Sequence, residues 1–224
     1  MTAIHVAIDG PGGAGKSTMA RALAGACGLN YVDTGAMYRT VGLAVCRAGI
    51  DPADAEKVTL LLPRIRIRLR YEEGVQHMLL CGEDVTGSIR TPEVSSAAST
   101  VSAIPAVRAF LLRAQQELAE NCSVVMDGRD IGTVVLPDAE LKVFLTASPE
   151  ERARRRYLEL SSKGTPQPYE QVLAEMNERD ERDSSRAAAP LRPAEDAVIL
   201  DTTGMSEEQV LHRLCELVEE RRRP

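Results

Sequence analysis

A glycine-rich stretch at residues 10–18, GPGGAGKST, constrains the fold of this chain more than any other part of its sequence. An apolar run from Ala3 to Ile8 leads into it and predicts a buried parallel strand that ends at Asp9. A helix over Lys16 to about Cys27 is expected directly after it. The fixed positions of the phosphate-binding loop pattern G-x-x-x-x-G-K-[ST] are all filled, by Gly10, Gly15, Lys16 and Ser17.

The chemistry of phosphate binding explains this order of residues. Glycines let successive backbone N–H groups converge on phosphate oxygens, and the helix N-terminus adds a partial positive charge of about half a unit. We expect Lys16 to reach the β and γ phosphates and the Ser17 hydroxyl to ligate Mg2+. The predicted nucleotide-binding residues are Gly10, Pro11, Gly12, Gly13, Ala14, Gly15, Lys16, Ser17 and Thr18. A glycine-rich turn without a ligand would explain the glycines but not the Lys-Ser pair.

Composition further limits the class of protein and the partners that this chain can have. A chain of 224 residues with 44% hydrophobic content suits one α/β domain with small excursions. A net charge of −6 provides no global field for nucleic acid or an anionic membrane, so we expect neither as a partner. Of the 27 basic residues only four are lysines. The arginine excess suits bidentate phosphate recognition, and a genome-wide arginine bias explains it equally well.

The five cysteines are odd in number and form no C-x-x-C pair, which favours reduced thiols over disulfides or zinc. No apolar run approaches the roughly 20 residues needed to span a bilayer. We therefore expect a cytoplasmic protein, and a monomer because no leftover apolar segment demands a partner.

Periodicity predicts an α/β order of elements. Expected strands are 29–32, 123–126, 141–145 and 197–200, with a hairpin of 65–71 and 75–81 around a turn at 72–74. Expected helices are 34–48, 51–62, 92–120 divided at Pro105, one opening at Ser148, 169–183 and 206–220. This order gives a central parallel sheet covered by helices on both faces, with a β-rich insertion and a lid.

Asp127 follows a buried strand, where open α/β sheets place their ligands, and such a carboxylate can hold Mg2+ through water. An Asp-Gly turn is the favoured alternative on this pattern alone.

The helix that opens at Ser148 carries Arg152, Arg154, Arg155 and Arg156. Four arginines in five residues repel one another, so they suit a phosphate clamp better than a structural role, although pairing with neighbouring glutamates remains an alternative. The loop 161–168, SSKGTPQP, makes this helix and its successor a plausible lid.

Five segments in order, IDGPGGAGKST, VDTGAMYR, GEDVTGSIRTPEV, MDGRDIGTVVLPDA and ERDERDSSRAAAPL, resemble the bacterial cytidylate kinases over nearly the whole chain. The resemblance implies transfer of the γ-phosphoryl group of ATP to CMP or dCMP with Mg2+. It also implies a single domain with a core at about 1–62 and 104–224, a nucleoside-monophosphate-binding insertion at about 63–103 and a lid at about 150–168.

Individual roles are implied only where motifs align. The acceptor phosphate would be held by Thr34, Arg39, Arg129 and Arg186. The cytosine edge would be read by Ser99, Arg108 and Asp130, and the sugar contacted by Arg179 and Asp183. The catalytic residues would be Lys16, Arg129, Arg152, Arg155 and Arg156, and the metal ligands Ser17 and Asp127. Two positions depart from the family: Thr34 stands where Ser is frequent, and Ser17 where some members have Gly.

Two alternatives remain on the sequence. A kinase of another small acceptor, such as UMP, another nucleoside monophosphate or shikimate, would share the loop and the lid, but not the long insertion. A nucleotide-binding switch would require a guanine-reading N-K-x-D motif, which the chain lacks.

Overall fold

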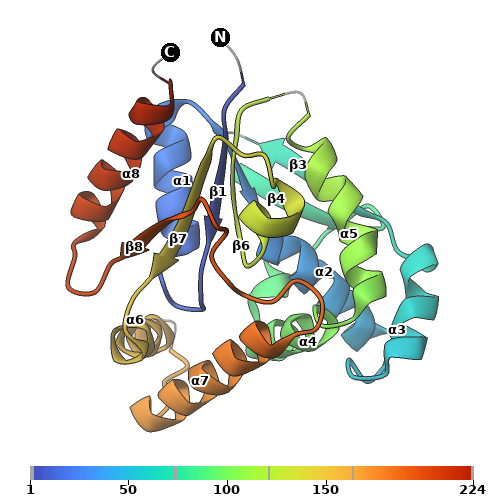
Figure 1. Cartoon of the computed structure of the whole chain (residues 1–224). Helices are drawn as coiled ribbons and strands as arrows, with labels where there is room; N and C mark the ends of the chain where they lie inside the picture. The colour runs from blue at the N-terminus through green and yellow to red at the C-terminus, as the bar shows by residue number, and fades with distance from the viewer. Residues whose placement is uncertain (1–2, 73–74, 121, 163, 223–224) are drawn as a thin grey trace. The chain divides into compact units, whose positions relative to one another are not determined.

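The computed structural model describes residues 3–72, 75–120, 122–162 and 164–222 (Figure 1). The chain divides into two compact units, Met1–Tyr31 with Cys122–Pro224, and Val32–Asn121. Each unit has its own hydrophobic core.

The first unit is built on a five-stranded sheet in the order β2-β6-β1-β7-β8. The strands are β1 (His5–Asp9), β2 (Asn30–Asp33), β6 (Val124–Gly128), β7 (Leu141–Thr146) and β8 (Val198–Asp201). β1 pairs in parallel with β6 and β7, and β7 pairs in parallel with β8. β1 is the central strand and is buried, so the glycine-rich loop that follows its carboxyl end lies at the middle of that edge of the sheet.

Helices α1 (Lys16–Cys27) and α8 (Glu207–Arg222) pack side by side on this sheet (Figure 1). Their apolar residues share one core with β1 and β7, including Leu23, Leu214 and Leu145. Helices α6 (Pro149–Ser162) and α7 (Tyr169–Ser185) pack on each other around a smaller cluster of Ala153, Leu160 and Val172.

Gly10 shows why the turn after β1 requires glycine. It has a φ of +147°, and a Cβ built on it would lie 1.9 Å from the carbonyl oxygen of Leu145 in the neighbouring strand. Any side chain would therefore push β1 and β7 apart at the start of the loop.

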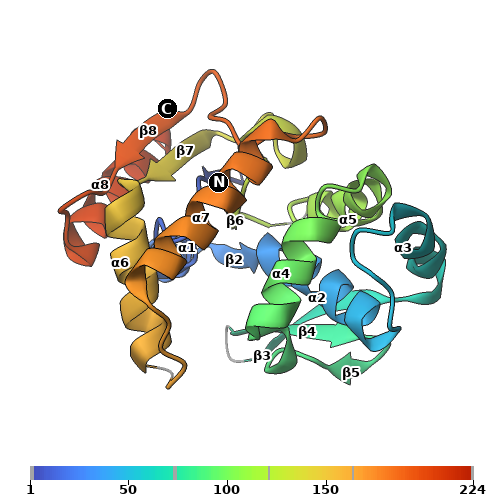
Figure 2. The ribbon, with the colours of Figure 1, turned by 90° about the horizontal axis from the view of Figure 1, so that it is seen from below.

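The second unit combines helices with a small antiparallel sheet in the order β3-β4-β5. Its strands are β3 (Ile67–Glu72), β4 (Val75–Leu80) and β5 (Glu83–Asp84). Its helices are α2 (Thr34–Arg47), α3 (Ala55–Leu61), α4 (Pro92–Val101) and α5 (Pro105–Glu117), with 3-10 turns at Leu62–Arg64 and Ser88–Arg90. Figure 2 shows the three strands side by side, with α2 and α4 adjacent to each other.

Gly42 allows the close packing of α2 on α4. A Cβ at this position would lie 2.9 Å from the backbone nitrogen of Ala98 and 3.1 Å from the carbonyl oxygen of Val94. The packed helices bury an apolar core that includes Met37, Val41 and Val101.

Most predicted elements are confirmed, including α1 with Gly28 as its left-handed C-cap and the division of the long helical region at Pro105. The predicted helix over 51–62 begins later, at Ala55, because the Asp51 side chain accepts from the Ala53 amide and Asp54 provides the cap. β5 and a π-helical turn at Ile131–Val135 were not predicted. The turn expected at 72–74 falls largely on residues 73–74, outside the described residues.

The insertion expected at about 63–103 lies inside the second unit, together with α2, α3 and α5. Among the described residues, no single helix is both long and apolar enough to cross a membrane. Within the described parts of the chain, one pair of helices, α4 and α5, meets that criterion when taken together, and the pair is bent by 100°.

Candidate functional site

The glycine-rich loop of the first unit has the geometry of a phosphate cradle. Gly10, Gly13 and Gly15 all have positive φ angles, and α1 begins at left-handed Gly15 without a side-chain cap. Because Gly15 has no side chain, the N-cap offers no acceptor to the first backbone amides of α1. These amides are therefore suited to bind an anion at the loop.

Lys16 is buried in this loop, and its Nζ donates a 2.7 Å hydrogen bond to the carbonyl oxygen of Pro11. Burial lowers the pKa of Lys16 well below its ordinary value, and the positive charges of Arg129 and Arg179 lower it further. An anionic ligand at the loop would favour the charged ammonium and so raise this pKa again.

Ser17 and Asp127 meet where α1 faces the end of β6. The Ser17 hydroxyl donates to Oδ2 of Asp127 at 2.7 Å, and the Tyr31 hydroxyl donates to Oδ1 at 2.9 Å. A hydroxyl and a buried carboxylate are the oxygen donors that suit Mg2+, so these residues fit that ion. Among the described residues, no group of three or more His, Cys, Asp or Glu side chains forms a metal cluster, so the remaining ligands would come from water or phosphate.

Asp9, at the end of β1, was not predicted as a site residue. Its carboxylate accepts from the backbone amides of Ile131 and Gly132, at 2.8 and 2.7 Å. Burial raises the pKa of Asp9 to about 6, against the effect of these two hydrogen bonds. Asp9 thus ties the loop entrance to the π-helical turn that directly follows Arg129 and the buried Asp130.

Asp183 gathers three predicted site arginines in the first unit. Arg129 Nε donates to its Oδ2 at 3.0 Å, and Arg179 and Arg186 each come within 3.9 Å. Burial opposes ionisation of Asp183, but the charges of these arginines lower its pKa below the ordinary value. One carboxylate among three guanidinium groups leaves local positive charge, which suits a phosphate ligand.

The predicted lid arginines differ in their surroundings. Arg152 is buried and donates to the carbonyl oxygens of Ala147 and Gly12 and to Asp180, so it braces the phosphate loop. Arg156 pairs with Glu159 on the helix surface. Arg154 and Arg155 share Glu151, which supports the glutamate-pairing alternative for part of the cluster.

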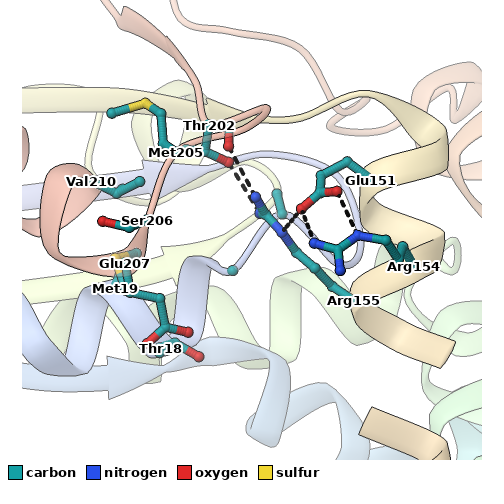
Figure 3. Close-up of a pocket in the computed structure, with 12 residues that line it drawn as sticks. Thr18, Met19, Glu151, Arg154, Arg155, Thr202, Met205, Ser206, Glu207 and Val210 are labelled. Carbon is teal, nitrogen blue, oxygen red and sulfur yellow. Dashed lines mark hydrogen bonds and ion pairs between the residues drawn. The ribbon is translucent and has the colours of Figure 1, made fainter. Parts of the chain in front are cut away.

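Arg155 also lines a cavity of about 290 Å³ beside the phosphate loop (Figure 3). Its guanidinium donates to the hydroxyl and the carbonyl oxygen of Thr202, at 3.1 and 3.0 Å. The cavity is lined by Ala14, Gly15, Thr18, Met19, Glu151, Arg154, Arg155, Thr202, Met205, Ser206, Glu207 and Val210. Thr202, Met205 and Ser206 were not predicted as site residues. Their position just after the last parallel strand was the available signal.

The other predicted site residues belong to the second unit. Thr34 and Ser99 are buried, and Arg108 donates to the carbonyl oxygen of Ser102 and lies over the ring of Tyr38. Arg39 Nη2 donates to both carboxylate oxygens of Asp33, while its Nε is buried without a hydrogen-bond partner in the part of the chain that the structure describes. A buried donor of this kind fits an anion acceptor.

The central parallel sheet, the phosphate loop with its lysine, and the strand-end carboxylate define a P-loop kinase. A solved structure of an uncharacterized protein from Eubacterium ventriosum shares the fold, with a TM-score of 0.55 and 12% identity over 98% of this chain and 99% of that one. The family model of cytidylate kinases matches residues 6–220. This chain belongs to the cytidylate kinase family.

Two curated relatives agree with this assignment. A cytidylate kinase of Caldicellulosiruptor bescii is 53% identical over 217 residues, 97% of this chain and 96% of the relative. A cytidylate kinase of Mycobacterium leprae is 52% identical over 222 residues, 99% of this chain and 98% of the relative.

Proposed function

We propose that this protein transfers the γ-phosphoryl group of ATP to CMP or dCMP, giving ADP and CDP or dCDP. The observation that carries the proposal is that one compact unit holds the phosphate loop, the Ser17–Asp127 pair and the arginine cluster on Asp183. Phosphoryl transfer requires positioning and charge neutralisation more than covalent chemistry, and these groups provide both.

ATP would bind with its phosphates on the loop amides and Lys16 and its base in the cavity beside Arg155. The cavity volume and its mixed lining of methionine, valine and hydroxyl side chains suit a flat, polar-edged base. Arg155 reaches both the cavity and Thr202, so it would connect the base site to the lid helix.

Ser17 and Asp127 would hold Mg2+. When bound, this ion neutralises charge on the donor phosphates and fixes their orientation. Asp127 would act as the carboxylate anchor, and Tyr31 would orient it through its second oxygen.

The acceptor phosphate would be held by Thr34, Arg39, Arg129 and Arg186. Arg179 and Asp183 would contact the sugar. Asp130, Ser99 and Arg108 would read the cytosine edge, because an aspartate accepts from the exocyclic amine that uracil lacks. Arg152, Arg155 and Arg156 belong to the proposed lid at about 150–168 and would act on the transferring phosphates. Closure of the lid would exclude water and so suppress ATP hydrolysis.

A coupled ADP-release assay with ATP and Mg2+ tests the proposal with CMP, dCMP, UMP, AMP and shikimate as acceptors. We expect rapid turnover confined to CMP and dCMP. Comparable turnover with UMP would favour the alternative of a broader kinase, and ADP release without an acceptor would indicate a nucleotide-binding switch. Asp130→Asn should lower the CMP-to-UMP preference, and an unchanged ratio would remove Asp130 from base reading.

The same proposal includes the remaining expectations from the sequence. The protein would be a monomer in the cytoplasm and would bind neither nucleic acid nor a membrane. Gel filtration of the purified full chain tests the oligomeric state.

A further inference from the structure

Asp33, the N-cap of α2, accepts hydrogen bonds from two arginines in the second unit. Arg39 Nη2 lies 2.8 Å and Arg90 Nη2 lies 3.3 Å from its Oδ2. Arg90 comes from the 3-10 turn Ser88–Arg90, 57 residues away in the sequence. The resemblance implies a role for Arg39 but none for Arg90.

The charges of this cluster do not balance. The Asp33 side chain is 6% exposed and carries one negative charge, whereas the two guanidinium groups carry two positive charges. The Arg90 side chain is 52% exposed, and in the described structure it donates only one of its five N–H groups, to Asp33. The cluster therefore presents positive charge, and the exposed Arg90 offers spare donors.

The carboxylate that holds both arginines is itself fixed. Oδ1 of Asp33 accepts from the Ala36 amide at 2.8 Å, as an N-cap does. Its backbone amide donates to the Gln76 side chain at 2.8 Å. A Cβ on Gly35 would lie 3.1 Å from Nη1 of Arg39, so glycine at this position avoids a steric clash with the guanidinium group. The arginine pair is thus preorganised before any ligand binds.

We propose that Arg90 is a further phosphate-binding arginine of the acceptor site, acting beside Arg39 in the second unit, and that Asp33 is the positioning residue of both. The inference rests on the proposed function for the identity of the acceptor, a nucleoside monophosphate. Two guanidinium groups on one carboxylate form a fork whose free N–H groups match the several oxygens of a phosphate.

Calorimetric titration of the full chain with CMP and with cytidine tests this proposal. In Arg90→Met the affinity for CMP should fall roughly tenfold to hundredfold, the range for one charge-assisted hydrogen bond, while the affinity for cytidine stays the same. Arg68→Met is the matched control, because Arg68 is an exposed arginine on β3 of the same unit, and it should change neither affinity. An unchanged CMP affinity, or an equal loss for CMP and cytidine, would overturn the proposal.

A purely structural tether between the turn and α2 predicts a different result. It would lower the melting temperature of Arg90→Met without a loss specific to the phosphate. Arg90→Lys keeps the charge and should retain part of the CMP affinity.

Failure of the wild-type chain to turn over CMP would overturn the proposed function and not this inference. Titration with inorganic phosphate, with ADP filling the phosphate loop, then decides it: Arg90→Met should bind phosphate at least severalfold more weakly than Arg68→Met. Equal phosphate binding by the two variants would contradict the inference.

Discussion

The Ser17 hydroxyl donates a 2.7 Å hydrogen bond to Oδ2 of Asp127, a residue 110 positions further along the chain. The contact places the first turn of α1 against the end of β6. It joins the two oxygen donors that we propose for Mg2+.

Asp127→Asn should raise the Mg2+ concentration needed for half-maximal turnover by about tenfold or more, because an amide binds a hard cation more weakly than a carboxylate. A Mg2+ titration of the steady-state rate measures this. Asp138→Asn, at an exposed aspartate of the same unit, is the control and should leave the titration curve unchanged. A wild-type Mg2+ dependence in Asp127→Asn would exclude Asp127 as the anchor.

Lys16→Met should reduce kcat by a factor on the order of 10³ or more, the scale of a cation acting on a transferring phosphoryl group. Its free energy of unfolding without ligand should stay within about 1 kcal/mol of wild type or rise, because the substitution removes a buried cation beside Arg129 and Arg179 at the cost of one hydrogen bond to Pro11. Chemical denaturation and the coupled assay measure the two effects. A large loss of stability would show that the buried ammonium is a structural necessity.

Asp9→Asn tests the raised pKa of Asp9. Because the folded pKa of about 6 exceeds the unfolded value of 3.8, the folded state binds more protons between these values. The contribution of Asp9 to stability is therefore greatest below pH 4 and falls as the pH rises to about 6.

The stability of wild type relative to Asp9→Asn should accordingly increase by about 2 kcal/mol from pH 7 to pH 4. The difference between the two proteins isolates Asp9, since all other titrating groups are common to both. Urea denaturation across this range measures it, and a pH-independent difference would contradict the assigned pKa.

Arg155→Met should raise the KM for ATP by about tenfold with a smaller effect on the KM for CMP, because Arg155 connects the cavity to Thr202. Arg154→Met is the comparison. Arg154 lines the same cavity and pairs with the same Glu151 but makes no bond to Thr202 in the described structure, so its substitution should have a smaller effect. Equal effects of the two substitutions would contradict a role for the bond from Arg155 to Thr202.

The sequence alone determined the local elements and the donor half of the site. The phosphate loop is recognisable because its chemistry depends on the backbone freedom of glycines and on a lysine and a serine at fixed offsets, all within nine residues. Helix boundaries such as Gly28 and Pro105 were predictable for the same reason, since caps and prolines act locally. The residues of the acceptor site were predicted from the family resemblance, because a single arginine forms no local sequence pattern that would mark it as a ligand-binding residue.

Tertiary structure decided which distant side chains meet. The bonds from Asp9 to the amides of Ile131 and Gly132, and the sharing of Asp33 by Arg39 and Arg90, join residues that no sequence period relates. It also separated Arg152, which braces the phosphate loop, from Arg155, which faces the cavity, although both lie on one helix within a single turn. Long-range contacts of this kind depend on how buried strands and helices pack, and the spacing of residues along the chain does not encode that packing in any local pattern.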